Sequence, residues 1–284
     1  MFEKGKLFLC ATPIGNLEDI TFRVIRCLKE ADLIAAEDTR NSVKLLNHFE
    51  IKTPMTAYHE HNKYEKGREL VRQMLSGKCI ALITDAGTPG ISDPGEELVR
   101  MCLDEGIGVT SLPGAAACVT ALTISGLSTR RFAFEAFLPS DKNERRKVLG
   151  EIKNEFRTIV IYEAPHRLKS TLKELAETLG NERRVSIVKE LTKVHESVRR
   201  MSLGEAVTFT EEEQPRGEYV LVIEGKSRAE EEEKIREGFM SMSLEEHMQM
   251  YLDEGMDKKA AMKAVAGDRG VSKSEVYKGL LDRS

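Results

Sequence analysis

The stretch 84–95 holds the residue types best suited to binding a small ligand. It follows the apolar run Cys79–Ile83, contains three glycines, two prolines and two aspartates, and runs into a predicted helix, Pro94–Glu105. Glycine lets the backbone approach a ligand closely, and proline fixes turns. An ordinary connecting turn usually needs about two to six residues. This longer loop is therefore predicted to be a binding site, while its Asp93, which precedes Pro94, is interpreted as a helix N-cap.

Other loops of similar character follow other predicted strands. In an open α/β sheet the loops beyond the carboxyl ends of the strands meet at one edge, where ligands bind. These loops are Thr12–Asn16, Glu37–Arg40, Pro113–Ala117, Glu163–Arg167 and Gln214–Glu218. The third of them opens a helix, whose first N–H groups are free to bind a ligand. We therefore predict a cleft between two halves of the chain, which suits a nucleoside-like cofactor better than hydrolytic chemistry.

Several common kinds of site are absent from the sequence. It has no GxxxxGK[ST] phosphate loop and no GxGxxG after the first strand. It has no GxSxG elbow that would present a serine nucleophile. No HExxH motif or Cys/His cluster is present, so no metal site is predicted.

The first hundred residues alternate predicted strands with predicted helices. The strands, besides 79–83, are Leu7–Ala11, Leu33–Ala36, Met55–Tyr58 and Val109–Leu112, and the helices are Ile20–Glu30, Ser42–Phe49 and Tyr64–Ser76. Short apolar strands that alternate with helices predict a mainly parallel sheet covered on both faces. The predicted fold class is therefore α/β.

The second half of the chain is predicted to contain a mixed sheet with fewer covering helices. Its predicted strands are Phe132–Leu138, Thr158–Tyr162, Val185–Val188, Val194–Arg199 and Tyr219–Ile223, and its helices are Asn143–Glu155 and Pro165–Leu179. This pattern predicts an α/β partner domain. The expected boundaries are 1–114 for the first domain, 115–226 for the second and 227–284 for a linker with a small helical module.

The tail beyond the charge run Glu230–Glu233 has three short helical patterns. Ser243 with Glu246 and Ser272 with Glu275 are predicted capping boxes, and Asp257 is a predicted cap. The spacing of Ala266, Gly270, Val271 and Val276 is what a helix-turn-helix requires. A three-helix module with no nucleic-acid role fits this pattern about equally well. Lys273, Lys278 and Arg283 would suit phosphate contacts better than the reading of bases.

Composition narrows the class of protein further. The 284 residues carry a net charge of −4, so a nucleic-acid-binding surface would have to be local. Candidates are Arg130–Arg131, Lys142–Lys147, Arg167–Lys169 and Arg183–Arg184, each of which alone is more often a solvated face. Five cysteines without ligand spacing and the absence of a signal-peptide pattern predict a cytoplasmic location. No apolar run approaches the roughly twenty residues of a membrane span.

Four motifs together resemble a known family. They are Ala11–Thr21, Ala36–Arg40, Thr84–Gly95 and Tyr162–Arg167. In these motifs the chain is similar to the ribosomal RNA small-subunit methyltransferase I family, cytidine 2′-O-methyltransferases of the tetrapyrrole-methylase superfamily. The resemblance runs over about residues 6–226, and the helical tail also resembles the tail of this family.

The resemblance implies a fold, a cofactor and a substrate. The fold would be the two-domain tetrapyrrole-methylase type, with S-adenosylmethionine in the cleft between the domains. The reaction would be methylation of a cytidine 2′-oxygen in the decoding centre of small-subunit ribosomal RNA, with the assembled 30S subunit as the expected partner. It also implies a homodimer, and no membrane partner is expected.

The cofactor-contacting motifs of the family carry over to particular residues of this chain. They fall on Pro13, Asp85, Gly87, Ile91, Ser92, Ala116, Ala117, Glu163, Ala164 and Gly217. Ala115 and Ala116 stand where the superfamily often has Pro-Ser, so backbone N–H groups are expected to serve there. A carboxylate such as that of Asp85 can accept hydrogen bonds from a ribose diol or an ammonium group. Alternatively, it caps the N–H groups of its own loop.

The group that activates the acceptor oxygen is not identified by the sequence. Candidates for a catalytic role are Glu37, Asp38, Arg40, Glu163 and His166. The segment Glu37–Arg40 could equally form an internal ion pair that fixes a strand end. His166 could simply pack at a helix start beside Pro165, and Arg167 could hold phosphate or developing charge.

Two other functions remain open at this point. A methyltransferase acting on a tetrapyrrole or another small molecule would use the same cleft but would leave the basic tail without a purpose. A non-catalytic RNA- or ribosome-binding protein would not bind the methyl donor at all.

Overall fold

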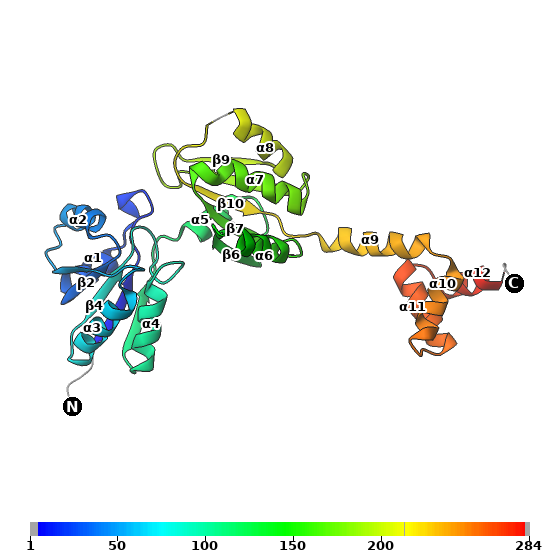
Figure 1. The fold of residues 1–284 in the computed structure, drawn as a ribbon, viewed down its shortest axis with the longest axis horizontal. Coiled ribbons are helices and arrows are strands. Elements are labelled where there is room, and N and C mark those ends of the chain that lie inside the picture. Colours follow the sequence, from blue (N-terminus) through cyan, green and yellow to red (C-terminus); the bar gives the residue numbers. More distant parts are fainter. Residues whose placement is uncertain (1–4, 213, 282–284) are drawn as a thin grey trace. The chain divides into compact units, whose positions relative to one another are not determined.

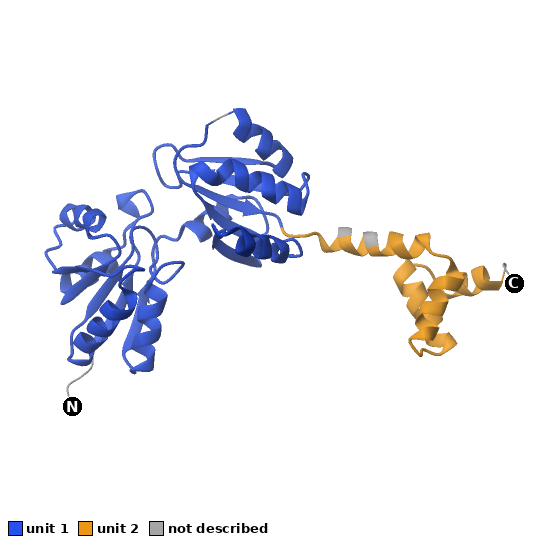
Figure 2. Ribbon diagram, viewed as in Figure 1, with its two compact units in different colours: residues 1–224 blue, residues 225–284 orange. Residues whose placement is uncertain are grey.

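The computed structural model describes residues 5–212 and 214–281, without the side chains of 230 and 234. The chain divides into two compact units, Met1–Glu224 and Gly225–Ser284 (Figure 2). The first unit contains two five-stranded sheets, and the second is helical. No helix in the described part of the chain is both long and apolar enough to cross a membrane.

The first sheet has the strand order β3-β2-β4-β1-β5, and every neighbouring pair is parallel. Its strands are β1 (Lys6–Cys10), β2 (Leu33–Ala36), β3 (Met55–Ala57), β4 (Ile80–Ile83) and β5 (Gly108–Leu112). Successive side chains of a strand point to opposite faces of the sheet. On β4, Ile80 and Leu82 join one buried cluster, whereas Ala81 and Ile83 join another. The sheet is therefore covered on both faces, which confirms the prediction.

Other strands of the sheet and the helices beside it (Figure 1) also contribute to these two clusters. One cluster draws on α3 (Lys63–Leu75) and α4 (Gly95–Asp104), and the other on α1 (Phe22–Glu30) and α2 (Thr39–His48). A short 3-10 turn, η1 (Leu17–Asp19), precedes α1. Helix α2 begins three residues before its predicted start, because the Asp38 carboxylate accepts the Arg40 N–H and caps the helix there.

The second sheet has the order β6-β7-β10-β8-β9 and is mixed, as predicted. Only β6 and β7 pair in parallel, and the other pairs are antiparallel. The strands are β6 (Phe132–Phe137), β7 (Thr158–Glu163), β8 (Arg184–Lys189), β9 (Ser197–Ser202) and β10 (Tyr219–Ile223). Strand β9 starts three residues later than predicted, in register with β8.

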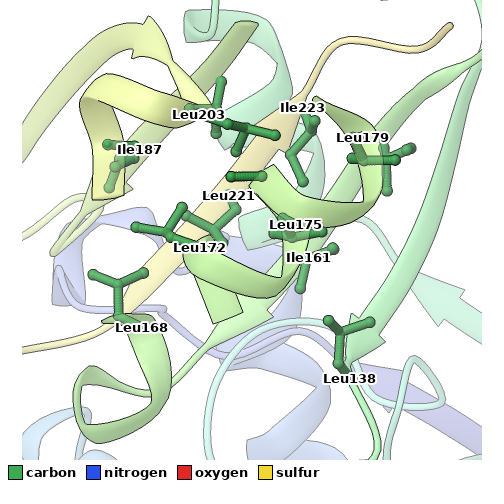
Figure 3. Packing of buried hydrophobic residues seen from close by; sticks show 14 of the residues in the cluster. Leu138, Ile161, Leu168, Leu172, Leu175, Leu179, Ile187, Leu203, Leu221 and Ile223 are labelled. Atoms are coloured by element: carbon green, nitrogen blue, oxygen red, sulfur yellow. The ribbon is translucent and has the colours of Figure 1, made fainter. Parts of the chain in front are cut away.

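The helices of this half are α5 (Ala117–Ile124), α6 (Lys142–Ile152), α7 (Pro165–Leu179) and α8 (Leu203–Glu212). Leucines at 168, 172, 175 and 179 of α7 form one stripe that packs on Ile161, Leu221 and Ile223 of the sheet (Figure 3). Helix α8, which was not predicted, contributes Leu203 and Ala206 to the same cluster. The opposite face of the sheet packs against α5 through Cys118, Ala121 and Leu122.

The second unit contains α9 (Arg228–Ser241), α10 (Leu244–Asp253), α11 (Lys258–Arg269) and α12 (Lys273–Leu281). Both predicted capping boxes are present, at Ser243 and Ser272, and Asp257 caps α11. Gly270 has φ +65° at the turn between α11 and α12. Ala266 and Val276 lie in the small core. The predicted helical module is therefore confirmed as a structure; Arg283 lies outside the described residues.

Candidate functional site

A cavity of about 380 Å³ lies where loops of the two sheets meet within the first unit. Its volume falls in the range of small-ligand sites, about 300–1,000 Å³. The lining comes from eight segments: Ile14, Ala86–Thr88, Ile91, Ala116–Cys118, Phe137, Tyr162–Pro165, Val188 with Leu191, and Glu218–Val220. Most of these side chains are small or apolar, so polar recognition of a ligand depends largely on backbone groups.

Backbone hydrogen bonds join the loop after β1 to the loop after β4. Thr12 and Gly87 exchange two bonds, N–H to O at 2.9 and 3.0 Å, as an isolated antiparallel bridge. The Thr12 hydroxyl also donates to the Thr84 carbonyl at 3.3 Å. Two loops 75 residues apart in the sequence are thereby held as one wall of the cavity.

The glycine-rich loop is also tied to the segment before α5. The Thr88 hydroxyl donates to the Ala115 carbonyl at 2.9 Å. Gly87 has φ +83°, a conformation that favours glycine, and a Cβ there would make a tight contact of 3.3 Å with Ile14 Cγ2. Asp93 accepts hydrogen bonds from the N–H groups of Gly90 and Gly95. The N-cap residue of α4 is Pro94, so Asp93 lies one residue before the predicted cap position and ties the loop to the helix start.

The start of α5 lies against the cavity. Ala116 is its N-cap residue and has no side-chain capping bond, and both Ala116 and Ala117 line the cavity. The Cys118 N–H donates to the Tyr162 hydroxyl at 3.0 Å. Burial raises the pKa of Tyr162, so this phenol stays protonated at neutral pH. Tyr162 thus takes one of the first N–H groups of the helix, and the lining residue Ala117 carries another.

Three charged residues beside β10, Glu190, Lys193 and Glu218, form a group that we call the clasp, and Glu218 lines the cavity. The Glu190 carboxylate accepts the Glu218 N–H at 2.9 Å, and Lys193 bridges Glu190 and Glu218 at 3.0 and 2.9 Å. Glu190 and Thr192 both have positive φ, at 51° and 66°. A Cβ on Gly217, which has φ +87°, would lie 2.6 Å from Glu190 Oε1. Gly217 therefore permits the clasp rather than lining the cavity itself.

Six of the ten predicted cofactor-contacting residues line this one cavity. They are Gly87, Ile91, Ala116, Ala117, Glu163 and Ala164. The other four, Pro13, Asp85, Ser92 and Gly217, adjoin lining residues in the sequence but are not part of the lining. Ser92 instead has φ +61° in the turn that follows Ile91.

The acidic candidates of the first sheet form a cluster at the ends of β2 and β4. The Thr84 hydroxyl donates to Glu37 at 2.6 Å, and the Asp38 N–H donates to Asp85 at 3.2 Å. Arg40 donates to both oxygens of Asp38 and holds the pKa of that carboxyl at about 2. Desolvation and the neighbouring Glu37 raise the pKa of Asp85, which is exposed. Asp38 and Arg40 thus form the ion pair at the strand end that the sequence left open.

Glu163 is buried and its oxygens are already occupied. One accepts the Ala164 N–H at 2.9 Å and lies 3.4 Å from Arg167 Nε, while the other accepts the Thr171 hydroxyl at 2.5 Å. Arg167 donates further to the Leu138 carbonyl at 2.6 Å. This arrangement favours a positioning role for Glu163, which fixes the start of α7. His166, in contrast, is exposed beside the lining residue Pro165.

Several lining residues were not identified from the sequence. Ile14, Ala86, Thr88, Pro165 and Glu218 fall within the predicted loops, so the loops themselves were the signal. Seven other lining residues lie outside the predicted loops, on or beside strands or in the first turn of α5, where an apolar residue is expected in the core. They are Cys118, Phe137, Tyr162, Val188, Leu191, Tyr219 and Val220. Within the described residues, no group of three or more His, Cys, Asp and Glu side chains could hold a metal ion.

The fold and the cavity together define a class that comparison with known proteins confirms. Residues 6–207 match the family of tetrapyrrole (corrin/porphyrin) methylases. A solved diphthine synthase superposes with a TM-score of 0.62 at 12% identity, covering 78% of this chain and 90% of that one. A uroporphyrin-III C-methyltransferase from Thermus thermophilus, solved with S-adenosyl homocysteine, gives 0.54 at 21%, covering 78% and 97%. At these identities the structural likeness shows the fold alone.

Relatives at higher identity narrow the class. A ribosomal RNA small subunit methyltransferase I from Halalkalibacterium halodurans is 51% identical over 97% of this chain and 94% of its own length. Its namesake from Bacillus subtilis is 46% identical with the same coverage. This chain therefore belongs to the tetrapyrrole-methylase superfamily and, within it, to the ribosomal RNA small subunit methyltransferase I family.

Proposed function

We propose that this protein transfers a methyl group from S-adenosylmethionine to the ribose 2′-oxygen of a cytidine in the decoding centre of small-subunit ribosomal RNA. The observation that carries the proposal is near-full-length identity, 51% and 46%, to relatives named as methyltransferases of this RNA. The cavity supports it, since six residues of the expected cofactor motifs converge there.

The residues of the cavity fit such a cofactor. Small side chains at Gly87, Ala116 and Ala117 let the backbone approach a ligand, and Ala117 at the start of α5 carries a first-turn N–H group that a ligand can use. Asp85, one residue before the lining, is proposed to accept hydrogen bonds from the cofactor's ribose or ammonium group. When bound, S-adenosylmethionine would supply an electrophilic methyl group on a positively charged sulfur.

The protein's main contribution to this reaction is alignment. Holding the acceptor oxygen in line with the methyl carbon and sulfur can contribute about 7–11 kcal/mol. A base that takes the hydroxyl proton would add roughly 10²- to 10⁴-fold. Three of the candidate carboxylates already have partners. Asp38 forms an ion pair with Arg40, while Glu37 and Glu163 accept hydrogen bonds from the hydroxyls of Thr84 and Thr171. We therefore favour His166, which is exposed and follows the lining residue Pro165 in the sequence.

We further propose that the substrate is the assembled 30S subunit, that the enzyme acts in the cytoplasm as a homodimer, and that the second unit contributes to RNA binding. Lys273 and Lys278 on α12 would contact phosphates. The arrangement of α11, the Gly270 turn and α12 supports this role, because it matches a helix-turn-helix in sequence spacing and capping.

The first test is nucleoside mass spectrometry of ribosomal RNA from a strain that lacks this gene. A 2′-O-methylated cytidine should disappear from the small-subunit RNA and return with the intact gene. Tritiated methyl transfer to 30S subunits from that strain, compared with naked RNA, identifies the substrate form. Absence of transfer to both would refute the proposal and direct attention to small-molecule acceptors, which the superfamily name suggests. Calorimetry that detects no cofactor binding would instead support a non-catalytic RNA-binding role.

A further inference from the structure

Phe137 is an exposed aromatic residue at the edge of the cofactor cavity. It ends β6, lines the cavity, and leaves 53% of its surface exposed. The other partly exposed large apolar residue of the lining is Ile91, at 43%. An aromatic ring kept in water beside a binding site needs an explanation, since burying it would stabilise the fold.

A β-bulge in β6 determines toward which face of the sheet this ring points. The pairing of β6 with β7 shifts between Phe134 and Ala136, so Phe134 faces Val160 whereas Phe137 faces Tyr162. Ala136 has φ +52°, an unfavourable conformation for a residue with a side chain. Without the bulge, residues 134 and 137 would point to opposite faces of the sheet. Such strain persists only where the surroundings impose it, and it is concentrated at functional sites.

The bulge brings both phenylalanines onto the same tyrosine. The rings of Phe134 and Phe137 pack edge-to-face on Tyr162, with centroids 4.9 and 5.6 Å away. The hydroxyl of Tyr162 is itself fixed by the Cys118 N–H at the start of α5. Phe137 is therefore held in place from one side while much of its surface stays open to solvent.

We propose that the open side of the Phe137 ring stacks on the base of the acceptor nucleotide and so presents its ribose 2′-oxygen to the cavity. This inference rests on the proposed function, in which the acceptor is a nucleotide of RNA. Proteins that recognise unpaired RNA nucleotides stack the bases on aromatic side chains, and such a contact replaces the stacking that a base loses when it leaves an RNA fold. Stacking on one ring is expected to change the affinity for RNA by about 10- to 100-fold.

The kinetic test uses 30S subunits that lack the modification. Phe137→Leu keeps an apolar side chain but removes the planar ring, whereas Phe137→Trp keeps a ring. We expect Phe137→Leu to raise the KM for 30S about 10- to 100-fold and Phe137→Trp to stay within about threefold of the wild type. The matched control is Phe132→Leu on the same strand, because Phe132 is 37% exposed and is not part of the lining.

A second measurement uses the absence of tryptophan from the chain. Phe137→Trp introduces a single indole fluorophore at the cavity edge, and Phe132→Trp provides its control. In the presence of S-adenosylhomocysteine, a short RNA hairpin carrying the acceptor cytidine should quench the indole fluorescence of the Phe137→Trp variant and leave that of the Phe132→Trp variant unchanged. If S-adenosylhomocysteine alone quenches the Phe137→Trp variant and RNA adds no further change, the ring belongs to the cofactor and the inference is overturned.

The two proposals fail in different ways. If wild-type protein transfers no methyl group to either 30S subunits or RNA, the proposed function fails. If the wild type is active but Phe137→Leu leaves the KM for 30S unchanged, the function stands and the stacking role is wrong. A cofactor Kd that rises in Phe137→Leu as much as the KM does would also contradict the stacking role.

Discussion

At the scale of single residues, the partners of each carboxylate decide what it can do. Asp38 is paired with Arg40, Glu37 with Thr84, and buried Glu163 with Thr171 and Arg167. Arg40 holds the pKa of Asp38 at about 2, which makes that carboxylate a weak proton acceptor. Asp85 differs, because partial desolvation and the neighbouring Glu37 raise its pKa.

Replacing Glu163 by Gln should therefore affect stability more than chemistry. A buried hydrogen bond to a charged group contributes about 1.5–3 kcal/mol, so we expect Tm to fall by about 5 °C. Glu211→Gln is the control, since that glutamate also faces α7, 3.7 Å from Lys169, but is exposed and should cost less than about 1 kcal/mol. A kcat loss of 10²-fold or more below the Tm of Glu163→Gln would instead indicate a catalytic base.

Cofactor binding should depend on the charge of Asp85. Its pKa is raised above the ordinary value of 3.8, so the carboxylate gains a proton, and the cofactor loses its acceptor, as pH falls through that raised value. Asp85→Asn should bind S-adenosylhomocysteine about tenfold more weakly at pH 7, and its affinity should not show this decrease as the pH falls. Calorimetry from pH 7 down to pH 4 measures both effects, and identical curves for the two proteins would rule out the role.

At the scale of elements, the cavity depends on loops that are joined by hydrogen bonds to backbone groups. Thr12 and Gly87 form a bridge between two strand ends, and Glu190 accepts the Glu218 N–H beside β10. Glycine is required where such contacts are close. Gly217 is the clearest case, because its missing Cβ leaves room for the Glu190 carboxylate.

Gly217→Ala should disturb the cavity, whereas Gly180→Ala should only strain the backbone. Both glycines have positive φ, at 87° and 95°, so each substitution should cost about 1 kcal/mol. A Cβ at 180 meets nothing within 4 Å, but one at 217 would displace Glu190 and hence Glu218, which lines the cavity. We expect only Gly217→Ala to weaken cofactor binding, by about tenfold. Equal cofactor affinity in the two variants would contradict this view of the clasp.

At the scale of the whole molecule, the chain has two units with separate cores. The cluster of the second unit contains Met248, Val265 and Val276, and the cavity belongs wholly to the first unit. Two separate cores can unfold separately. A ligand of the cavity should therefore stabilise only one of them.

Hydrogen exchange with saturating S-adenosylhomocysteine tests this expectation. At a ligand concentration of about 100 times Kd, the first unit should gain about 2.7 kcal/mol of stability. Peptides from the strands of residues 5–212 should exchange more slowly, while peptides from 244–281 should keep their rates. Comparable slowing in both sets would show that the two units are coupled.

The sequence by itself determined the features that depend on local chemistry. Glycine and proline marked the loop 84–95, the sequence predicted the helix Pro165–Leu179 with the bounds that α7 has, and Ser243 and Ser272 marked helix starts in the second unit. These signals need only neighbouring residues, because a turn, a cap or an amphipathic face is specified within a few positions of the chain. Family motifs extended this local information to a fold class and a cofactor.

Only the tertiary structure decided which residues come together at the cavity and which side chains are hydrogen-bonded to one another. In the sequence Phe137 is an ordinary strand residue, and only the bulge at Ala136 and the pairing of β6 with β7 place it beside Tyr162 at the cavity. The hydrogen bonds from Thr171 to Glu163 and from Cys118 to Tyr162 depend on how the chain folds back on itself. The physical reason is that strand register and side-chain partners are set by contacts between segments distant in sequence.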